Sequence, residues 1–464
     1  MDDNGDMRHA DVEPPIIVEN PLVRYDEPVR AALQELNRKS RSGGRFEAGH
    51  ALPAPSDDLT SFFASSDIAI TDLGEYAGRR LRMLDLMRNE RTRTTKTFAS
   101  RLIVARAVEH IRRTGERMMI VSPSSGNKAT ALRDAVLAAH ETGLATPEQL
   151  AILVVVPTAS RAKLWSSPLA SDPQARVRNP VAVYPGMRRD EVKALAAGLV
   201  DGFGAELYGR FGVRLWYTLD LDNYRVADIV RAFVEQDYLP HANERLHVHA
   251  VSSAFGLLGH ALGARRLAKA GHGESTARYF MVQHLDTPDM VLSLYFGSTS
   301  RRSLPSYTLD NANGFYRQDA DPRFPLTTFT VDEILDPTFY TRQPATSAEM
   351  NALIRSQGGG GIVVSRHECL QRYSTLREVL QSAGYILPAV PDDLREWSLV
   401  MALTGVLNGI DRGLVSETDI LVHGSGSYQV TDFTPISEAC LKTVGSIGDL
   451  AKVAADAAEG KTDA

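Results

Sequence analysis

Cysteine is nearly absent from this 464-residue chain, which contains only Cys369 and Cys440. The two are far apart and form no CxxC pair, so neither a disulfide framework nor a thiolate zinc site is expected. His247 and His249 alternate along an expected strand and share one face, but two histidines without a third ligand do not make a zinc site. We therefore expect no metal. Two free thiols favour a reducing cytoplasm.

Long apolar runs and surplus positive charge are also missing. No apolar run approaches the roughly 20 residues that cross a bilayer, and the first 15 residues lack the apolar core of a signal peptide. Lysine and arginine number 51 against 57 acidic residues, a net charge of −6. The densest basic run, 79–93, is expected to be a solvated helix face. We expect neither a membrane nor a nucleic-acid partner.

Short apolar runs alternate with helical patterns, which predicts an α/β fold with mainly parallel sheets. Eight strands are expected, dividing into two sheets of four near residue 220, at 118–121, 151–156, 180–184, 213–219, 246–251, 278–283, 361–364 and 419–422. Helices are expected between them at 128–142, 189–202, 225–236, 255–270, 370–383 and 397–412.

The same pattern suggests a domain organisation. It comprises a partly disordered N-terminal arm (1–60) with one short helix (28–38), a smaller domain (61–220), a larger domain (221–450) and a flexible tail (451–464). Within the larger domain, 286–355 breaks the rhythm and is rich in Pro, Ser, Asp and Tyr, which indicates an insertion or lid.

A small polar loop, Ser124–Asn127, stands where an expected strand passes to a helix. The first N–H groups of a helix lack partners within it, and its positive dipole end faces the loop, so an anion would bind well there. An ordinary helix-capping turn explains the same residues. The motifs GxxxxGK[ST] and GxGxxG are both missing, which weakens ATP and dinucleotide hypotheses.

Lys96 precedes an amphipathic helix in RTRTTKTFASRLIVARAVEHIRR. It is the only lysine between Lys39 and Lys128. A lysine at such a position can be a neutral amine that forms Schiff bases with carbonyl compounds. A solvated surface lysine is the alternative.

The lysine, the helix, the strand and then S-x-G-N resemble the pyridoxal-phosphate (PLP) enzymes of fold type II. This superfamily includes tryptophan synthase β, cysteine synthase and threonine synthase. The resemblance implies two domains, each a twisted, mainly parallel sheet flanked by helices, and a homodimer. It implies that Lys96 holds the cofactor as an internal aldimine and acts as general base, and that Asn127 bonds the pyridine 3′-hydroxyl. The substrate carboxylate would be held by Ser124, Ser125, Gly126 and Asn127.

Two further segments match the family. LHVHAVSSAFGLLGH offers a phosphate loop at Ser252, Ser253, Ala254, Phe255 and Gly256, although a plain capped helix would also fit. It is less rich in glycine than the family's loop. Near the C-terminus, His423 stands before Gly424-Ser425-Gly426, where the family has a Ser or Thr that meets the pyridine nitrogen. His423 or Ser425 would take that role.

The resemblance thus implies a PLP-dependent lyase or β/γ-replacement enzyme acting on an amino acid. The layout around the insertion is nearest to threonine-synthase relatives, and the divergent motifs suggest a specialised substrate such as one of secondary metabolism. Two other hypotheses stay open. One is a non-catalytic binding module that keeps the fold, and the other is an enzyme that binds a phosphorylated substrate without PLP.

Overall fold

The computed structural model describes residues 7–8, 14–39, 45–188, 191–219, 221–239, 244–273, 277–339 and 341–460. The chain forms two compact units, each assembled from separate segments. Unit 1 comprises Met1–Val18, Asp67–Arg88 and Arg231–Val430, and unit 2 comprises Glu19–Ser66, Asn89–Val230 and Thr431–Ala464. Within the described residues, no helix has the length and apolarity needed to cross a membrane.

Unit 2 is built on a five-stranded parallel sheet of order β18-β7-β6-β5-β8. Its strands are β5 (Arg117–Pro123), β6 (Leu150–Pro157), β7 (Val181–Tyr184), β8 (Val213–Tyr217) and β18 (Leu441–Thr443). The four strands expected in the first sheet are confirmed. The fifth, β18, is a short edge strand from the far end of the chain that was not predicted.

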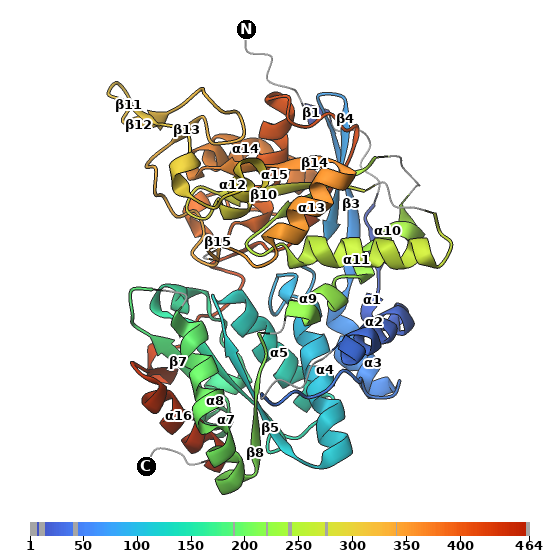
Figure 1. Ribbon diagram of the computed structural model, residues 1–464, viewed down its shortest axis with the longest axis vertical. Helices are drawn as coiled ribbons and strands as arrows, with labels where there is room; N and C mark the ends of the chain where they lie inside the picture. The colour runs from blue at the N-terminus through green and yellow to red at the C-terminus, as the bar shows by residue number, and fades with distance from the viewer. Residues whose placement is uncertain are drawn as a thin grey trace. The chain divides into compact units, whose positions relative to one another are not determined.

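Helices cover both faces of this sheet (Figure 1). On one face lie α4 (Lys96–Thr114) and α5 (Asn127–Glu141); on the other lie α8 (Glu191–Phe211) and α16 (Ile447–Glu459). The prediction of a flexible tail at 451–464 is wrong up to residue 459. These residues belong to α16, whose Leu450 and Ala454 are fully buried in the core with α8. The other helices of this unit are α1 (Pro21–Arg24), α2 (Asp26–Lys39), α3 (Asp57–Phe63), α6 (Pro168–Ser171), α7 (Pro173–Arg178) and α9 (Leu221–Ala227).

Unit 1 contains an eight-stranded sheet of order β1-β3-β4-β16-β9-β10-β14, with β2 paired to β3. The run from β4 to β14 is parallel, and β1, β2 and β4 each pair antiparallel with β3. The strands are β1 (Met7–Arg8), β2 (Ile16–Val18), β3 (Ile68–Tyr76), β4 (Arg79–Asp85), β9 (Leu246–Ala250), β10 (Arg278–His284), β14 (Gly359–Val364) and β16 (Asp419–Gly424). The four strands expected in the second sheet are β9, β10, β14 and β16, and they are confirmed.

The sequence suggested that the basic run 79–93 is a helix face, and this prediction is wrong. Residues 79–85 form β4, joined to β3 by a two-residue turn in which Ala77 and Gly78 both have positive φ (48° and 74°), a geometry that suits a tight hairpin. Apolar Leu81 and Met83 are buried, at the two-residue spacing of a strand. Between them, Arg82 is paired with an acidic side chain of β16.

The sheet of unit 1 lies between two helical layers (Figure 1). Apolar side chains of its parallel strands pack on one face with α14 (Arg366–Ser382) and α15 (Ser398–Asp411). On the other face they pack with α11 (Phe255–Lys269), α12 (Asp289–Phe296) and α13 (Ser347–Gln357). The expected helix over 225–236 is instead two, α9 and α10 (Val230–Tyr238).

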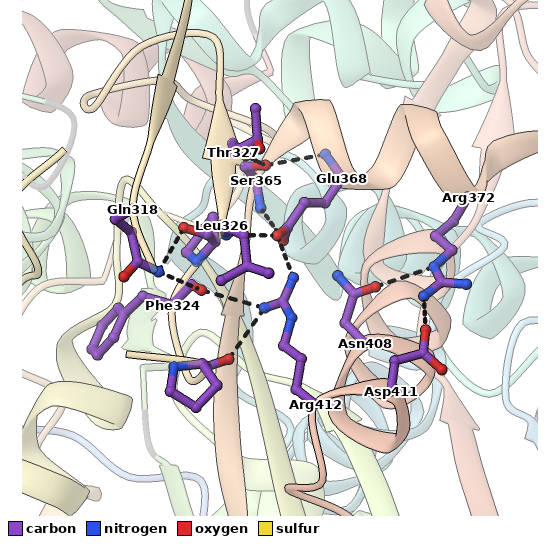
Figure 2. Close-up of polar contacts among 12 residues, drawn as sticks. Gln318, Phe324, Leu326, Thr327, Ser365, Glu368, Arg372, Asn408, Asp411 and Arg412 are labelled. Atoms are coloured by element: carbon purple, nitrogen blue, oxygen red, sulfur yellow. Dashed lines mark hydrogen bonds and ion pairs between the residues drawn. The ribbon is translucent and has the colours of Figure 1, made fainter. Parts of the chain in front are cut away.

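The expected insertion at 286–355 carries α12, most of α13 and a small three-stranded sheet. The three strands are β11 (Thr308–Asp310), β12 (Phe315–Arg317) and β13 (Thr327–Thr328). Outside the insertion, unit 1 also contains a two-stranded sheet of β15 (Leu394–Glu396) and β17 (Tyr428–Gln429). Figure 2 shows how the segment after β12 is fastened: buried Glu368 of α14 accepts a bond from the Leu326 amide (2.9 Å) and pairs with Arg412. The insertion is therefore tied to the body of unit 1 by polar contacts.

A carboxylate in unit 2 gives the protein an acid-sensitive contact. Glu116 accepts bonds from Arg214 (2.8 Å), Tyr208 (2.7 Å) and His110 (2.9 Å), and the bonds from Arg214 and Tyr208 are the main reasons why its pKa falls from 4.5 to about 2. A depressed carboxyl pKa stabilises the fold above pH 4.5, and this contribution is lost as the pH falls toward 2.

We therefore expect Glu116→Gln to lower the free energy of unfolding at pH 6 by about 1 kcal/mol, after allowing for solvent screening of a partly exposed group. The difference from wild type should vanish near pH 2. Urea unfolding at both pH values measures it, with exposed Glu206→Gln on α8 as the control. A Glu116→Gln effect of equal size at both pH values would contradict the assignment.

Candidate functional site

The loop Ser124–Asn127 joins β5 to α5, as expected. The buried Ser124 hydroxyl oxygen accepts bonds from the amides of Gly126 (3.0 Å) and Ala129 (2.8 Å), so it closes the loop from inside. Gly126 has φ 124° and ψ −71°, a conformation that L side chains rarely adopt. Ser125 and Asn127 are only half-buried. The hydroxyl of Ser124 is thus used within the loop, while Ser125 and Asn127 are the more accessible side chains.

Lys96 is the first residue of α4 rather than a residue before it. Its half-buried side chain places the amine 5.4 Å from the centre of the Tyr224 ring, within range of a cation–π contact. The residue before it, Thr95, is helical in backbone and makes no side-chain cap. The lysine therefore sits at a helix start that Thr95 does not cap with its side chain.

A buried polar network holds the turn that leads into Lys96. Asn89 donates to Thr97 (3.2 Å) and to Asp134 of α5 (3.0 Å), and Thr97 also bonds Thr92 (2.7 Å). The other strong partner of Asp134 is Arg101 of α4, at 2.9 Å, and both side chains are nearly fully buried. This network fixes the start of α4, and the turn before it, against the middle of α5.

Two neighbours of this site were missed by the sequence reasoning. Lys128 is buried, donates to the Thr218 carbonyl (3.1 Å) and also lies 5.7 Å from the Tyr224 ring centre. Its position directly after Asn127 was a signal that could have flagged it. Tyr224 offered no such signal, because only the fold brings α9 beside the start of α4.

In unit 1 the loop Ser252–Gly256 leads from β9 into α11, as expected. The hydroxyls of Ser252 and Ser253 both bond Thr341 (3.2 and 3.3 Å). Ala254 has a left-handed backbone, φ 53°, which costs a residue other than glycine about 1 kcal/mol. Phe255 is half-buried and begins the helix. The loop is held in one strained shape by contacts with the insertion.

Gly256 is the only glycine of this loop, and its lack of a side chain leaves room for a neighbouring arginine. A Cβ atom placed there would lie 2.7 Å from Nη2 and 2.8 Å from Nη1 of Arg231. The guanidinium of Arg231, which is 2% exposed, therefore packs directly against the loop backbone. Arg231 was not predicted, since nothing in its sequence context distinguishes it.

His423 is the residue that departs from the family at the C-terminal motif, and it is fully buried in β16. Its Nε2 lies 3.1 Å from Nδ1 of His247 and its Nδ1 lies 3.4 Å from Nη1 of Arg231. Its ring stacks on that of His249 at 3.8 Å. Both nitrogens of His423 are thus engaged by the protein, whereas Ser425, two residues on, is half-buried.

A family model matches almost the whole chain. The match covers residues 17–458 and is to a family of unknown function, DUF6002. The chain belongs to the DUF6002 family. No curated protein matches it by sequence.

Solved structures resemble this DUF6002 chain in fold. The PLP-bound threonine synthase from Brucella melitensis is 13% identical, with a TM-score of 0.54 over 95% of this chain and 90% of that one. A fungal L-serine ammonia-lyase from Rhizomucor miehei is also 13% identical, over 78% of this chain and 91% of that one, but its TM-score of 0.47 is too low to support an argument. The DUF6002 chain therefore has the two-domain α/β architecture of the fold type II PLP enzymes, as the sequence predicted.

Proposed function

We propose that this DUF6002 chain is a PLP-dependent enzyme that acts on an amino acid by β-elimination or by β- or γ-replacement. The observation that carries the proposal is the placement of Lys96 and of the Ser124–Asn127 loop. They lie at the N-terminal ends of α4 and α5, two helices that pack together in a chain with fold type II architecture.

The residues present suit the cofactor's chemical groups. A half-buried lysine at a helix start supplies the amine that an aldehyde requires. The Ser252–Gly256 loop presents backbone N–H groups at the start of α11, and the Arg231 guanidinium lies against it. Backbone amides at a helix start together with an arginine suit a phosphate group.

When bound, PLP supplies an electron sink for negative charge that develops next to the amino group of the substrate. The protein provides the rest of the chemistry. Lys96 takes the proton from the α-carbon as general base, and the amides of Ser125, Gly126 and Asn127 hold the substrate carboxylate at the positive end of α5. The Asn127 side chain orients the pyridine 3′-oxygen.

The expected partner of the pyridine nitrogen is a position at which this chain differs from the fold type II PLP enzymes. Both nitrogens of His423 are engaged, by His247 and by Arg231, which favours Ser425 as the group that meets the pyridine nitrogen. A hydroxyl partner leaves that nitrogen largely unprotonated and restrains the electron sink. This favours elimination or replacement at the β-carbon, and the substrate class proposed is an amino acid with a leaving group there.

The decisive experiment is the visible spectrum of the purified chain with added PLP. We expect a visible absorption band, and we expect borohydride reduction followed by peptide mass spectrometry to place a pyridoxyl group on Lys96. Candidate amino acids that shift the band then identify the substrate. A protein that stays colourless with PLP would refute the proposal, and a coloured protein that turns over no amino acid would favour a non-catalytic binding module.

A further inference from the structure

A cluster of buried histidines lies in unit 1, on the sheet face that α11 covers. His247 and His249 come from β9, His423 from β16 and His260 from α11. All four are at most 4% exposed. Glu235 of α10 contacts the cluster from the side of the helices. So many titratable groups buried together require their protons to be arranged in a defined way.

The first contact fixes the proton of His423. An arginine guanidinium can only donate hydrogen bonds, so Nδ1 of His423, 3.4 Å from Arg231 Nη1, must be the acceptor. Burial holds the pKa of His423 well below its usual value, so the ring is neutral. A neutral imidazole carries one N–H. The proton of His423 is therefore on Nε2.

The proton position on His423 then fixes the proton position on the neighbouring ring, His247. Nε2–H of His423 faces Nδ1 of His247 at 3.1 Å, so this Nδ1 accepts. Burial lowers the pKa of His247 to about 3, so it too is neutral and its proton lies on Nε2. Nε2 of His247 lies 3.5 Å from Oε1 of Glu235 but forms no hydrogen bond there, so this link is an electrostatic contact between an N–H dipole and a carboxylate.

Glu235 is the acceptor end of the chain from both sides. Its Oε2 accepts from Nε2 of His260 (2.7 Å), whose Nδ1 in turn accepts from the hydroxyl of Tyr279 (2.9 Å). Its Oε1 also accepts from Arg245 (2.7 Å). Burial opposes the ionisation of Glu235, but these neighbours outweigh it and leave its pKa below the usual range. Arg245 and His260 thus both donate to this one carboxylate, which His247 also faces.

The same residues could be read as a metal site. Glu235, His247 and His260 each offer a ligand atom within 4.8 Å of the others, and two histidines with a carboxylate suit zinc. A metal would need Nε2 of His247 without its proton. Moving that proton to Nδ1 would force Nδ1–H of His423 against the N–H groups of Arg231. The contact between Arg231 and His423 therefore favours the polar chain over the metal.

We propose that His247 and His423, joined by hydrogen bonds to each other and to Arg231 and facing the Glu235 carboxylate, form a one-way polar chain that positions the guanidinium of Arg231 under the Ser252–Gly256 loop as the charge partner of the cofactor phosphate. The inference rests on the proposed function, which assigns the phosphate to that loop. The three are positioning residues, and Arg231 is the residue that contacts the phosphate.

The tautomers are the first test. In long-range ¹H–¹⁵N spectra of the full chain labelled with ¹⁵N-histidine, His247 and His423 should both be neutral with the proton on Nε2. Signals are assigned from single histidine variants. A proton on Nδ1 of His247, or stoichiometric zinc that is lost in Glu235→Gln, would overturn the chain.

The second test asks whether Arg231 contacts the phosphate. It compares the binding of PLP with the binding of pyridoxal, which lacks the phosphate. His423→Leu should weaken PLP binding by about tenfold or more, while pyridoxal binding stays unchanged. His423→Gln should restore PLP binding, because its amide can accept from Arg231 and donate to His247. Arg231→Lys keeps the charge without the fork and should show a partial loss, which covers the case that His423→Leu does not fold.

The outcomes separate this inference from the proposed function. A wild-type chain that does not bind PLP would refute both. A wild-type chain that binds PLP, together with a His423→Leu variant that loses PLP and pyridoxal equally, would refute the inference alone. Failure of His423→Gln to restore PLP binding would also count against the chain.

Discussion

Lys96→Ala is expected to abolish the visible absorption band of the PLP-loaded protein and to lower turnover by about 10²–10⁴-fold or more, the usual contribution of a general base. The structure gives the reason. Lys96 begins α4, which packs beside α5, and its side chain is half-buried. The nearby Lys128 is not expected to replace it, because that side chain is buried and donates to the Thr218 carbonyl.

The matched controls are two other lysines of the same unit. Lys452→Ala removes an exposed helical lysine of α16 and should leave the band and turnover intact. Lys128→Met should retain the band, since that amine is not the covalent partner. A band that survives in Lys96→Ala, or a borohydride label found on Lys128, would show that the covalent residue has been misassigned.

Asp134→Ala is expected to lower the free energy of unfolding by about 3–5 kcal/mol, because it leaves the buried guanidinium of Arg101 without its carboxylate. Both side chains are at most 5% exposed and lie 2.9 Å apart. The same change removes an acceptor of Asn89, which holds the turn leading to Lys96. Urea unfolding measures the loss, and the stability gained on adding PLP should fall in parallel.

The control for Asp134 is a carboxylate of the same helix that shares a partner with it. Glu141 also pairs with Arg91 (2.8 Å), but both side chains are more than 40% exposed. Such pairs contribute about 0–1 kcal/mol, so Glu141→Gln should change the stability little. Equal effects of Asp134→Ala and Glu141→Gln would mean that burial does not govern this network.

The central strands of both sheets could be predicted from the sequence because they are buried on both faces. Runs such as 118–121 and 151–156 are continuously apolar, and helical patterns separate them, which is typical of parallel α/β sheets. The same reasoning failed for 79–85, where an arginine-rich strand looks like a charged helix face. It pairs with β16, more than 300 residues away in sequence, and local propensity carries no information about such a partner.

The loops of the candidate site were predictable from local patterns, but the side chains that the fold packs against them were not. Lys96 and the Ser124–Asn127 loop were singled out because helix starts have physical requirements that a short sequence shows. Their roles toward a cofactor remain predictions. The loop Ser252–Gly256 was found in the same way, but the sequence could not show that its one glycine makes room for Arg231.

The sequence by itself determined the α/β class, the strands that form the centre of each sheet, and the strand–loop–helix junctions. Each depends on the spacing of apolar residues and on unsatisfied N–H groups, which are local properties. Only the tertiary structure decided which side chains meet. His423 contacts Arg231 across 192 positions and His247 across 176. Proton positions in such a cluster depend on which groups are donors and which are acceptors at contact distance, and only the folded chain sets those distances.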